Sequence, residues 1–240
     1  MNRVLSFTLA LFVAGCVEIA APPPSAPPPS GPVTGTPVPA RLDSRTAADN
    51  FAAVVSTVRP VAERECRARS PQLNCSFNIV IDDRPGQPPN AFQTVDRAGR
   101  PVIGFTLALI AEARNRDELA FVMGHEAAHH IAGHLPRTQQ SAVAGALIFG
   151  TLAGVVGGGA SDVQVAQDLG ATVGARRFSK EFELEADALG TVIAHRAGFN
   201  AARGAEFFNR LPDPGNRFLG THPPNAERRA VVLRTLEGLR

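Results

Sequence analysis

The stretch "GHEAAHHIAGH", residues 124–134, constrains this chain most, because it holds four of the six histidines in 240 residues. An α-helix turns about 100° per residue, so side chains four positions apart lie on one face. His125 and His129 form such a pair, and Glu126 directly follows the first. H-E-x-x-H on a helix is typical of two imidazoles that bind zinc beside a carboxylate that activates the metal's water. The sequence therefore predicts a helix with two zinc ligands and a general base.

The alternative is a charged helix that carries its histidines on the surface. Small residues around them, such as Gly124 and Ala128, favour a buried helix. Buried imidazoles and carboxylates need polar partners, which a zinc ion supplies. His134 stands one place early for the third ligand of the longer signature H-E-x-x-H-x-x-G-x-x-H. We expect it to support the site from outside the ligand set, or to be a cation at the helix end.

The boundaries of this helix are also readable. Asn115 is a suitable N-cap, and Glu118 three places later completes the pattern of a capping box. We expect Pro136 to end the helix, because the residue before a proline is biased away from helical backbone.

The third ligand has to come from later in the chain. "RFSKEFELEADALG", residues 177–190, is a predicted helix rich in acidic residues, and both Glu183 and Glu185 flank its apolar stripe. A helical wheel does not choose between them. Glu183 has one advantage, because Asp187 lies one turn further on and could orient a zinc-bound histidine. A solvated acidic face is the other interpretation of this segment.

The N-terminus has the pattern of an export signal. One arginine precedes a short apolar run that meets Cys16, and "VAGC" resembles a bacterial lipobox. We expect a lipoprotein signal peptide at 1–15, then a lipid anchor on Cys16 with a Pro-rich linker over 16–40, and one domain over 41–240. An ordinary cleaved signal is the alternative. Val17 does not resemble an inner-membrane retention signal, which favours the outer membrane.

Composition adds two expectations. The Pro-rich linker favours polyproline II and a stiff spacer, although a proline-rich peptide ligand has the same composition. Cys66 and Cys75 suggest one disulfide in an exported protein, with two free thiols as the alternative. The net charge of +2 indicates no nucleic-acid partner.

The remaining pattern predicts an α+β fold that is mainly helical. Residues 46–69 suit a helix, "CSFNIVIDD" suits a strand, and residues 91–106 suit a hairpin that turns at Arg97–Gly99. Helical patterns continue from there to the C-terminus, so a small sheet is followed by many helices.

Three blocks, "ELAFVMGHEAAHHIAGH", "FSKEFELEADALG" and "THPPNAERR", resemble the M48 family of zinc metallopeptidases over roughly residues 45–235. The resemblance implies a zincin-like metallopeptidase domain with one Zn²⁺ per chain. The family's E-x-x-A-D pattern implies Glu183 as the third ligand and Asp187 as its companion, beside His125 and His129. "PNAF" resembles the segment before the family's edge strand, which can pair with substrate. A lysine in "FSKEF" stands where many members have arginine, which is a mild departure.

Two further residues are candidates for catalysis. A tetrahedral oxyanion needs a hydrogen-bond donor besides the metal, and this chain contains no tyrosine. His222 and Arg228 match the family's C-terminal His-Pro and downstream arginine. We expect His222 to lie near the metal, where it donates to the oxyanion or occupies the open position at rest. A structural cap of a Pro-rich turn is the competing interpretation.

An uncharged apolar stretch covers residues 141–161, about the length of a membrane span. The first two ligands precede it and Glu183 follows it, so a single crossing would place the ligands on opposite sides of a bilayer. We expect a small-residue helix or hairpin packed beside the cleft, in the position of a lid. A membrane-surface or partner contact is the alternative.

Together these features predict a zinc endopeptidase of the bacterial periplasm, lipid-anchored at Cys16 to the outer membrane. The resemblance to the family implies that its role is protein quality control. Its expected partners are unfolded or misfolded envelope proteins, the membrane and outer-membrane assembly machinery. One rival is a chaperone or assembly factor that seldom cuts, although a pure holder would not need Glu126. Another is a structural zinc protein, but such sites are usually closed by four protein ligands.

Overall fold

A computed structural model describes residues 42–215 and 222–240. The predicted signal peptide, the lipidation site at Cys16 and the Pro-rich linker lie outside the described residues.

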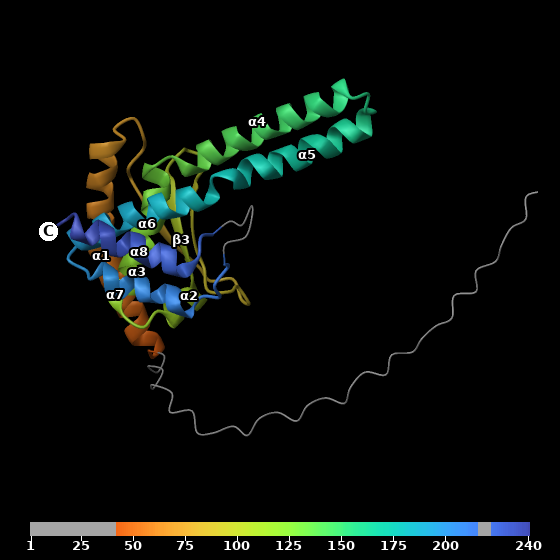
Figure 1. The fold of residues 1–240 in the computed structure, drawn as a ribbon. Coiled ribbons are helices and arrows are strands. Elements are labelled where there is room, and N and C mark those ends of the chain that lie inside the picture. The colour runs from red at the N-terminus through yellow and green to blue at the C-terminus, as the bar shows by residue number, and fades with distance from the viewer. Residues whose placement is uncertain (1–41, 216–221) are drawn as a thin grey trace, which may run out of the picture. The chain divides into compact units, whose positions relative to one another are not determined.

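Helices dominate the described chain, which also contains one small sheet (Figure 1). This confirms the mainly helical α+β class. The elements, in order, are α1 (Ser44–Arg69), β1 (Asn78–Asp82), β2 (Ala91–Val95), β3 (Pro101–Thr106), α2 (Leu107–Glu112), α3 (Arg116–Ile131), α4 (His134–Val155), α5 (Ala160–Arg177), α6 (Ser179–Arg196), α7 (Ala201–Gly204), the short 3-10 helix η1 (Ala205–Arg210) and α8 (Asn225–Glu237).

The sheet has the order β1-β3-β2, with β3 parallel to β1 and antiparallel to β2. All six residues of β3 are buried, which suits a central strand. The hairpin predicted at 91–106 is confirmed as β2 and β3. Its turn is held by the Asp96 carboxylate, which accepts hydrogen bonds from the backbone amides of Ala98 and Arg100. Strand β2 is left at an edge of the sheet.

The core lies between α1, α3, α6 and the inner face of the sheet. Val54 and Val58 of α1 are fully buried, as are Phe105 of β3 and Ile193 of α6. Phe105 also packs edge-on against the ring of Phe51, with ring centroids 5.1 Å apart. Helix α3 is thus enclosed by apolar neighbours, as the small residues of its sequence predicted.

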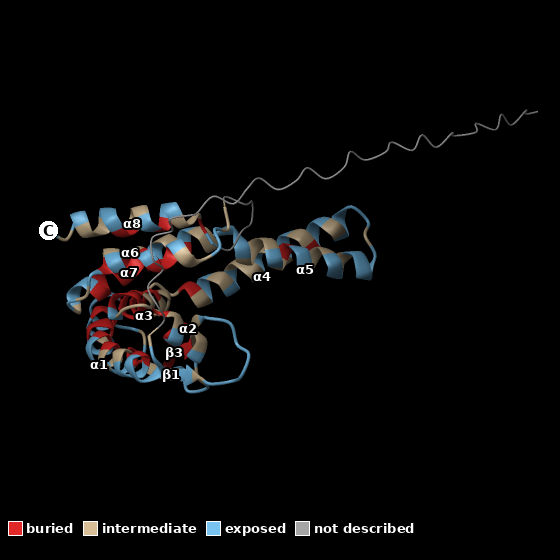
Figure 2. Cartoon of the chain, turned by 90° about the horizontal axis from the view of Figure 1, so that it is seen from below, coloured by how far each residue is buried: buried red, intermediate tan, exposed pale blue. Residues whose placement is uncertain are grey.

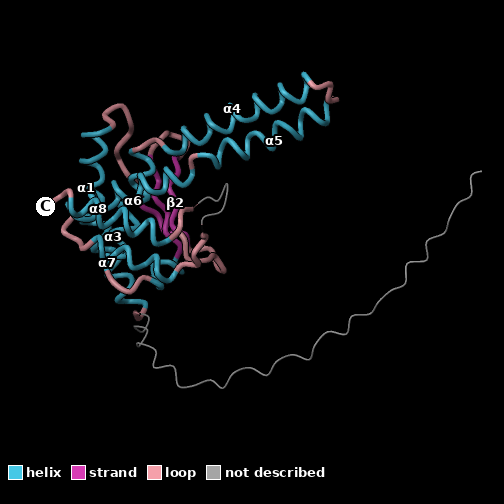
Figure 3. The backbone as a smooth tube through the Cα atoms, viewed as in Figure 1, coloured by secondary structure: helices cyan, strands magenta, loops and turns pink. Residues whose placement is uncertain are grey.

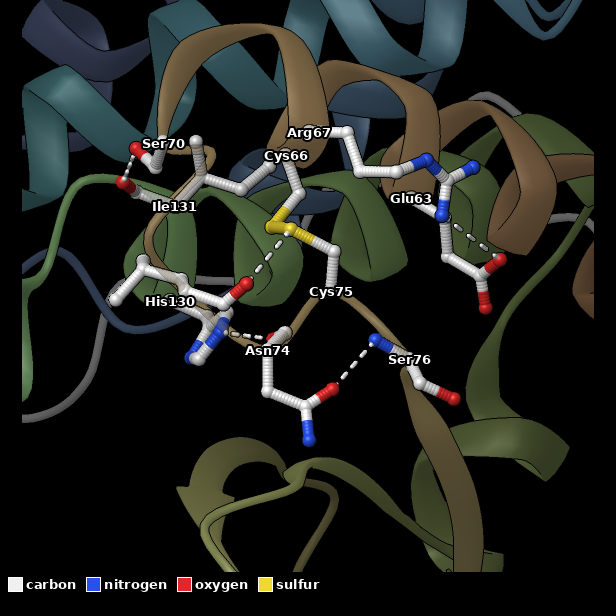
Figure 4. Close-up of a disulfide and its surroundings, with 10 residues drawn as sticks. Glu63, Cys66, Arg67, Ser70, Asn74, Cys75, Ser76, His130 and Ile131 are labelled. Carbon is white, nitrogen blue, oxygen red and sulfur yellow. Dashed lines mark hydrogen bonds and ion pairs between the residues drawn. A yellow bond between two sulfur atoms is a disulfide. The ribbon is translucent and has the colours of Figure 1, made fainter.

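A disulfide between Cys66 and Cys75 closes the loop after α1 (Figure 4). Two hydrogen bonds join this loop to the end of α3. The Ser70 hydroxyl donates to the Ile131 carbonyl oxygen over 2.8 Å, and the His130 Nε2 lies 2.8 Å from the Asn74 carbonyl oxygen. The C-terminal end of α3, just after the two predicted zinc ligands, is therefore held against α1.

The prediction that Pro136 ends the metal-binding helix is wrong. Helix α3 ends at Ile131, and Gly133 follows with a left-handed φ of 66°. Glycine adopts this backbone without a steric cost, so it stops the helix first. Pro136 instead lies in the first turn of α4, where its missing N–H costs no hydrogen bond.

The N-terminus of α3 is capped, but only half of the expected capping box forms. The Asn115 side chain accepts a hydrogen bond from the Glu118 amide over 3.1 Å. The Glu118 carboxylate accepts from the Arg114 amide instead, and it pairs with both terminal nitrogens of Arg210. This buried ion pair ties the start of α3 to η1.

Helices α4 and α5 form an antiparallel hairpin that projects from the rest of the described chain (Figures 1 and 3). Glycines let the two helices approach closely, since a Cβ at Gly145 would stand 2.0 Å from the Gly170 carbonyl oxygen. The expected small-residue hairpin is therefore present. The expectation that it packs beside the cleft is wrong for its outer part, where many residues are exposed (Figure 2). The exposed residues there include large apolar ones such as Leu147 and Val155. Among the described residues, no helix is long and apolar enough to cross a membrane.

Candidate metal centre

Three predicted ligands converge where α3 meets α6. The Nε2 atoms of His125 and His129 lie 3.0 Å apart. The Glu183 carboxylate oxygens lie 3.6 Å from the Nε2 of His125 and 3.4 Å from that of His129. Ligands at ~2.0–2.1 Å from a tetrahedral zinc ion are themselves about 3.3 Å apart. Two imidazoles and one carboxylate at these separations fit such an ion. Of the two candidate carboxylates, that of Glu183 lies beside the imidazoles, whereas that of Glu185 lies beside His134.

Two glycines let the helices that carry the ligands come together. A Cβ at Gly124 of α3 would stand 2.7 Å from the Gly190 carbonyl oxygen, and one at Gly190 of α6 would stand 2.7 Å from the His125 amide nitrogen. Any side chain at either position would separate the two helices. His125 and Glu183 therefore reach the same point because the backbone of α3 at His125 touches α6 at Gly190, two turns beyond Glu183.

Asp187 supports the first ligand. Its carboxylate lies 2.9 Å from the Nδ1 of His125, and it is fully buried. Burial alone would lower the pKa of His125, but the hydrogen bond to Asp187 raises it above its ordinary value. With the Nδ1 proton donated to Asp187, the Nε2 lone pair faces the metal position.

Arg228 of α8 holds Asp187 in turn. Its Nε and one terminal nitrogen each lie 2.7 Å from an oxygen of the Asp187 carboxylate. The same terminal nitrogen is 3.3 Å from Glu183. The pKa of Arg228, which burial would lower, is raised by the Asp187 carboxylate. The paired arginine compensates two buried carboxylates and links the C-terminal helix to the centre.

His134 supports the second ligand in a parallel way. Its Nδ1 lies 2.8 Å from the Nδ1 of His129, and its Nε2 lies 3.1 Å from Glu185. Its ring also stacks on Phe182, with centroids 4.5 Å apart. Burial lowers the pKa of His134 to about 4, so it is not the helix-end cation that the sequence allowed. It supports the site from outside the ligand set, which was the other expectation.

Glu126 points into the open side of the centre, where it lines two cavities. Burial raises its pKa above the ordinary value, and the neighbouring His125 and His129 oppose that shift. Glu126 is next to His125 in the same turn of α3, but its carboxylate lies in the wall of the cleft. This position suits a group that exchanges protons with a molecule in the cleft.

His222 approaches from the segment before α8. Its Nδ1 lies 3.2 Å from a Glu183 oxygen, while more than half of its side chain is exposed. Burial would raise the pKa of Glu183, but hydrogen bonds from His129 and His222 hold it well below the usual range. The structure thus places His222 at the edge of the metal position. This is the arrangement expected if His222 acts near the metal, rather than as a cap of the Pro-rich turn.

Two cavities meet at the centre, with volumes of about 290 and 270 Å³. They share Glu126, His129, Glu183 and His222. The second cavity has an apolar wall that the sequence did not reveal, formed by Leu109, Phe121, Val122, Phe207, Phe208 and Leu211. The only sequence signal for this wall in η1 is the adjacent pair Phe207 and Phe208. Adjacent positions do not show which face of η1 meets the cleft.

The edge strand β2 lies along the same cleft, and Gln93 of this strand lines the first cavity. A third cavity, of about 350 Å³, continues past Gln93 and His129 toward the β2–β3 turn. An extended peptide laid beside β2 would therefore pass the metal position with room on both sides.

Comparisons with known proteins agree with this geometry. A profile described as peptidase family M48 matches residues 48–236. A relative from Vibrio cholerae serotype O1, named "Putative beta-barrel assembly-enhancing protease", is 32% identical over 126 residues. The match covers 48% of this chain and 25% of the relative, so this chain spans only a part of that protein. With three ligands, their supports and an open cleft in place, the chain belongs to the M48 family of metallopeptidases.

Proposed function

We propose that this protein is a zinc-dependent endopeptidase of the bacterial cell envelope that hydrolyses peptide bonds in unfolded or misfolded proteins. One observation carries the proposal. His125, His129 and Glu183 present three metal-binding atoms within 4.8 Å of one another, and Glu126 lies in the cleft that opens beside them. Three protein ligands leave one position for water or substrate, which is the arrangement of catalytic rather than structural zinc sites.

Zinc bound by these three residues would polarise the peptide carbonyl and lower the pKa of water toward 7. Glu126 is placed to accept a proton from water in the cleft and to return it to the leaving amine. Asp187 and His134 keep the imidazoles of His125 and His129 oriented while this happens. His222 is the proposed oxyanion donor, because it lines both cavities beside the metal position.

Arg228 has a different proposed role from the one its sequence position suggested. Its guanidinium is committed to Asp187 and Glu183 behind the ligands. We therefore assign it to positioning the ligand set, and assign contact with the substrate to His222.

Three features support a cell-envelope location with a lipid anchor at Cys16. The N-terminal sequence resembles a lipobox. The disulfide between Cys66 and Cys75 suits an oxidising compartment such as the periplasm. The similar Vibrio cholerae protein is named for β-barrel assembly, which is compatible with an envelope location. The expected substrates are accordingly envelope proteins, and the outer-membrane assembly machinery is an expected partner.

The words "beta-barrel assembly-enhancing" in the name of that relative are compatible with a second candidate, a factor that holds or assembles outer-membrane proteins with little proteolysis. Measurements on the full-length chain and on Glu126→Gln separate the two. We would measure zinc content and the cleavage of unfolded casein. One zinc in both proteins, with cleavage by wild type alone, supports the peptidase. Zinc in both without cleavage supports the holding function, and the absence of zinc would refute the metal site.

A further inference from the structure

The outer part of the α4–α5 hairpin presents an apolar surface that the peptidase mechanism does not use. Of the thirteen large hydrophobic side chains exposed in the described chain, eight lie on this hairpin, each 55% exposed or more. They are Val143, Leu147, Ile148, Leu152, Val155, Val156, Val165 and Leu169. Exposed apolar patches of this kind mark a surface that meets a partner or a membrane.

We propose that this hairpin binds the surface of an anionic lipid bilayer, lying in the interface with α4 toward the acyl chains. The proposal goes beyond the peptidase function and is independent of it.

The distribution of apolar residues on α4 favours lipid over a protein partner. No charged residue occurs from Thr138 to Ser161. From Val143 to Val155 the exposed apolar positions of α4 span about 180° of the helix, at 100° per residue. Docking against one helix or one second copy needs a stripe of ~100°. A fluid apolar phase contacts a wider arc, because it has no fixed shape.

Helix α5 determines how the hairpin lies. Val165 and Leu169 form one exposed strip, but Gln164 and Asp168 form the strip beside it and hydrogen bond to each other. Upright insertion would bring Asp168 into hydrocarbon, which is costly. A hairpin lying flat instead keeps the polar strip of α5 among the headgroups, as amphipathic interfacial helices do.

The base of the hairpin supplies charge complementarity. Arg176 and Arg177 at the end of α5 are both exposed. The Arg177 guanidinium lies 5.1 Å from the ring centroid of Phe178, which is itself 39% exposed. Arginine side chains can keep their charge among the headgroups while their stems cover apolar surface, and an anionic bilayer attracts each basic residue near it.

This surface is continuous with the cleft. Leu135 and Thr138, in the first turns of α4, line the cavity that holds Glu126. Ser179 and Phe182, just after α5, line the same cavity. A hairpin bound to lipid would therefore place the mouth of the cleft at the membrane surface.

The absence of tryptophan and tyrosine makes a direct test possible. Single tryptophans would be placed in the full-length chain as Leu152→Trp on α4, Gln164→Trp on α5, and Leu233→Trp on α8. Each protein is mixed with vesicles of phosphatidylethanolamine and phosphatidylglycerol, with and without bromine on the acyl chains. Brominated chains quench only an indole in contact with them, so an anchor elsewhere in the chain does not create the signal.

We expect a blue shift and strong quenching for Leu152→Trp, weaker quenching for Gln164→Trp, and none for Leu233→Trp. Arg176→Gln with Arg177→Gln should weaken binding of the Leu152→Trp protein to these vesicles about tenfold or more.

Equal quenching at all three positions would overturn the proposal. A blue shift of Leu152→Trp without vesicles, on raising the protein concentration or adding unfolded casein, would also overturn it. The hairpin would then bind a second copy of the chain or an unfolded protein. Equal binding to neutral phosphatidylcholine vesicles would refute the role of the arginines. Cleavage is not measured, so failure here is distinct from failure of the peptidase proposal.

Discussion

Gly190 of α6 lies directly against the backbone of His125 in α3. A Cβ at Gly190 would stand 2.7 Å from the His125 amide nitrogen and 2.9 Å from its Cα. This contact places a metal ligand of one helix beside the helix that carries Glu183. The geometry of the centre therefore depends on a residue without a side chain as much as on its ligands.

Gly190→Ala should separate α3 from α6. We expect the free energy of unfolding to fall by about 1–3 kcal/mol, as for other overpacked sites. The zinc affinity should fall with it, because His125 and Glu183 move apart. Urea unfolding and competition with a chelator measure the two effects. Gly154→Ala is the matched control, since a Cβ there meets nothing within 4 Å. A harmless Gly190→Ala would contradict the close approach.

Asp187→Asn should weaken zinc binding about 10–100-fold, because the amide orients His125 less firmly than the carboxylate does. Glu185→Gln is the comparison, because Glu185 acts on His129 only through His134 and half of its side chain is exposed. We expect the smaller loss from this variant. Competition with a metal indicator gives both affinities, and losses of equal size would show that the two supports do not differ.

Zinc should stabilise the folded protein, because its three ligands converge only after α3 and α6 have packed. At 100 times the dissociation constant the expected gain is about 2.7 kcal/mol, seen as a higher melting temperature. His129→Ala removes one of the three ligands and should lose most of that gain. Thermal unfolding followed by circular dichroism, with and without zinc, tests this, and an equal rise in both proteins would place the metal elsewhere.

The ion pairs of Glu65 with Arg196 and Arg69 should make stability depend on pH. Burial would raise the pKa of Glu65, but hydrogen bonds from the two arginines lower it below the model-peptide value of 4.5. Between the folded and the unfolded pKa of Glu65, the unfolded state therefore binds more protons than the folded state. The stabilisation by these ion pairs is present above about pH 4.5 and is lost as the pH falls through the pKa of Glu65 in the folded state. The difference in unfolding free energy between wild type and Glu65→Gln should shrink on acidification.

Urea unfolding at a series of pH values measures that difference. Glu63→Gln is the control on the same helix, because Glu63 makes only long pairs of 3.8 and 3.9 Å with exposed arginines. Such surface pairs contribute little. If Glu63→Gln and Glu65→Gln changed the pH dependence of the unfolding free energy equally, the ion pair between Glu65 of α1 and Arg196 of α6 would stabilise the fold no more than a surface pair does.

The local pattern of the sequence was sufficient for the β2–β3 hairpin, for most of α1 and for the ligand face of α3. Periodicity of 3.6 residues places His125 and His129 together on any helix, and alternation with a turn signal predicts the β2–β3 hairpin. The paired cysteines indicated the disulfide because exported chains seldom keep two free thiols. The resemblance to the family then singled out Glu183 and Asp187.

Tertiary structure decided what lies opposite each face, because a helical period says nothing about partners distant in the chain. The break at Gly133 turns His134 back onto His129, where a helix continuing to Pro136 would have carried it away. Arg228 reaches Asp187 only because α8 packs on α6. The outer part of the α4–α5 hairpin is not packed against the cleft, because its glycines bury each helix against the other, which leaves the large apolar residues facing outward.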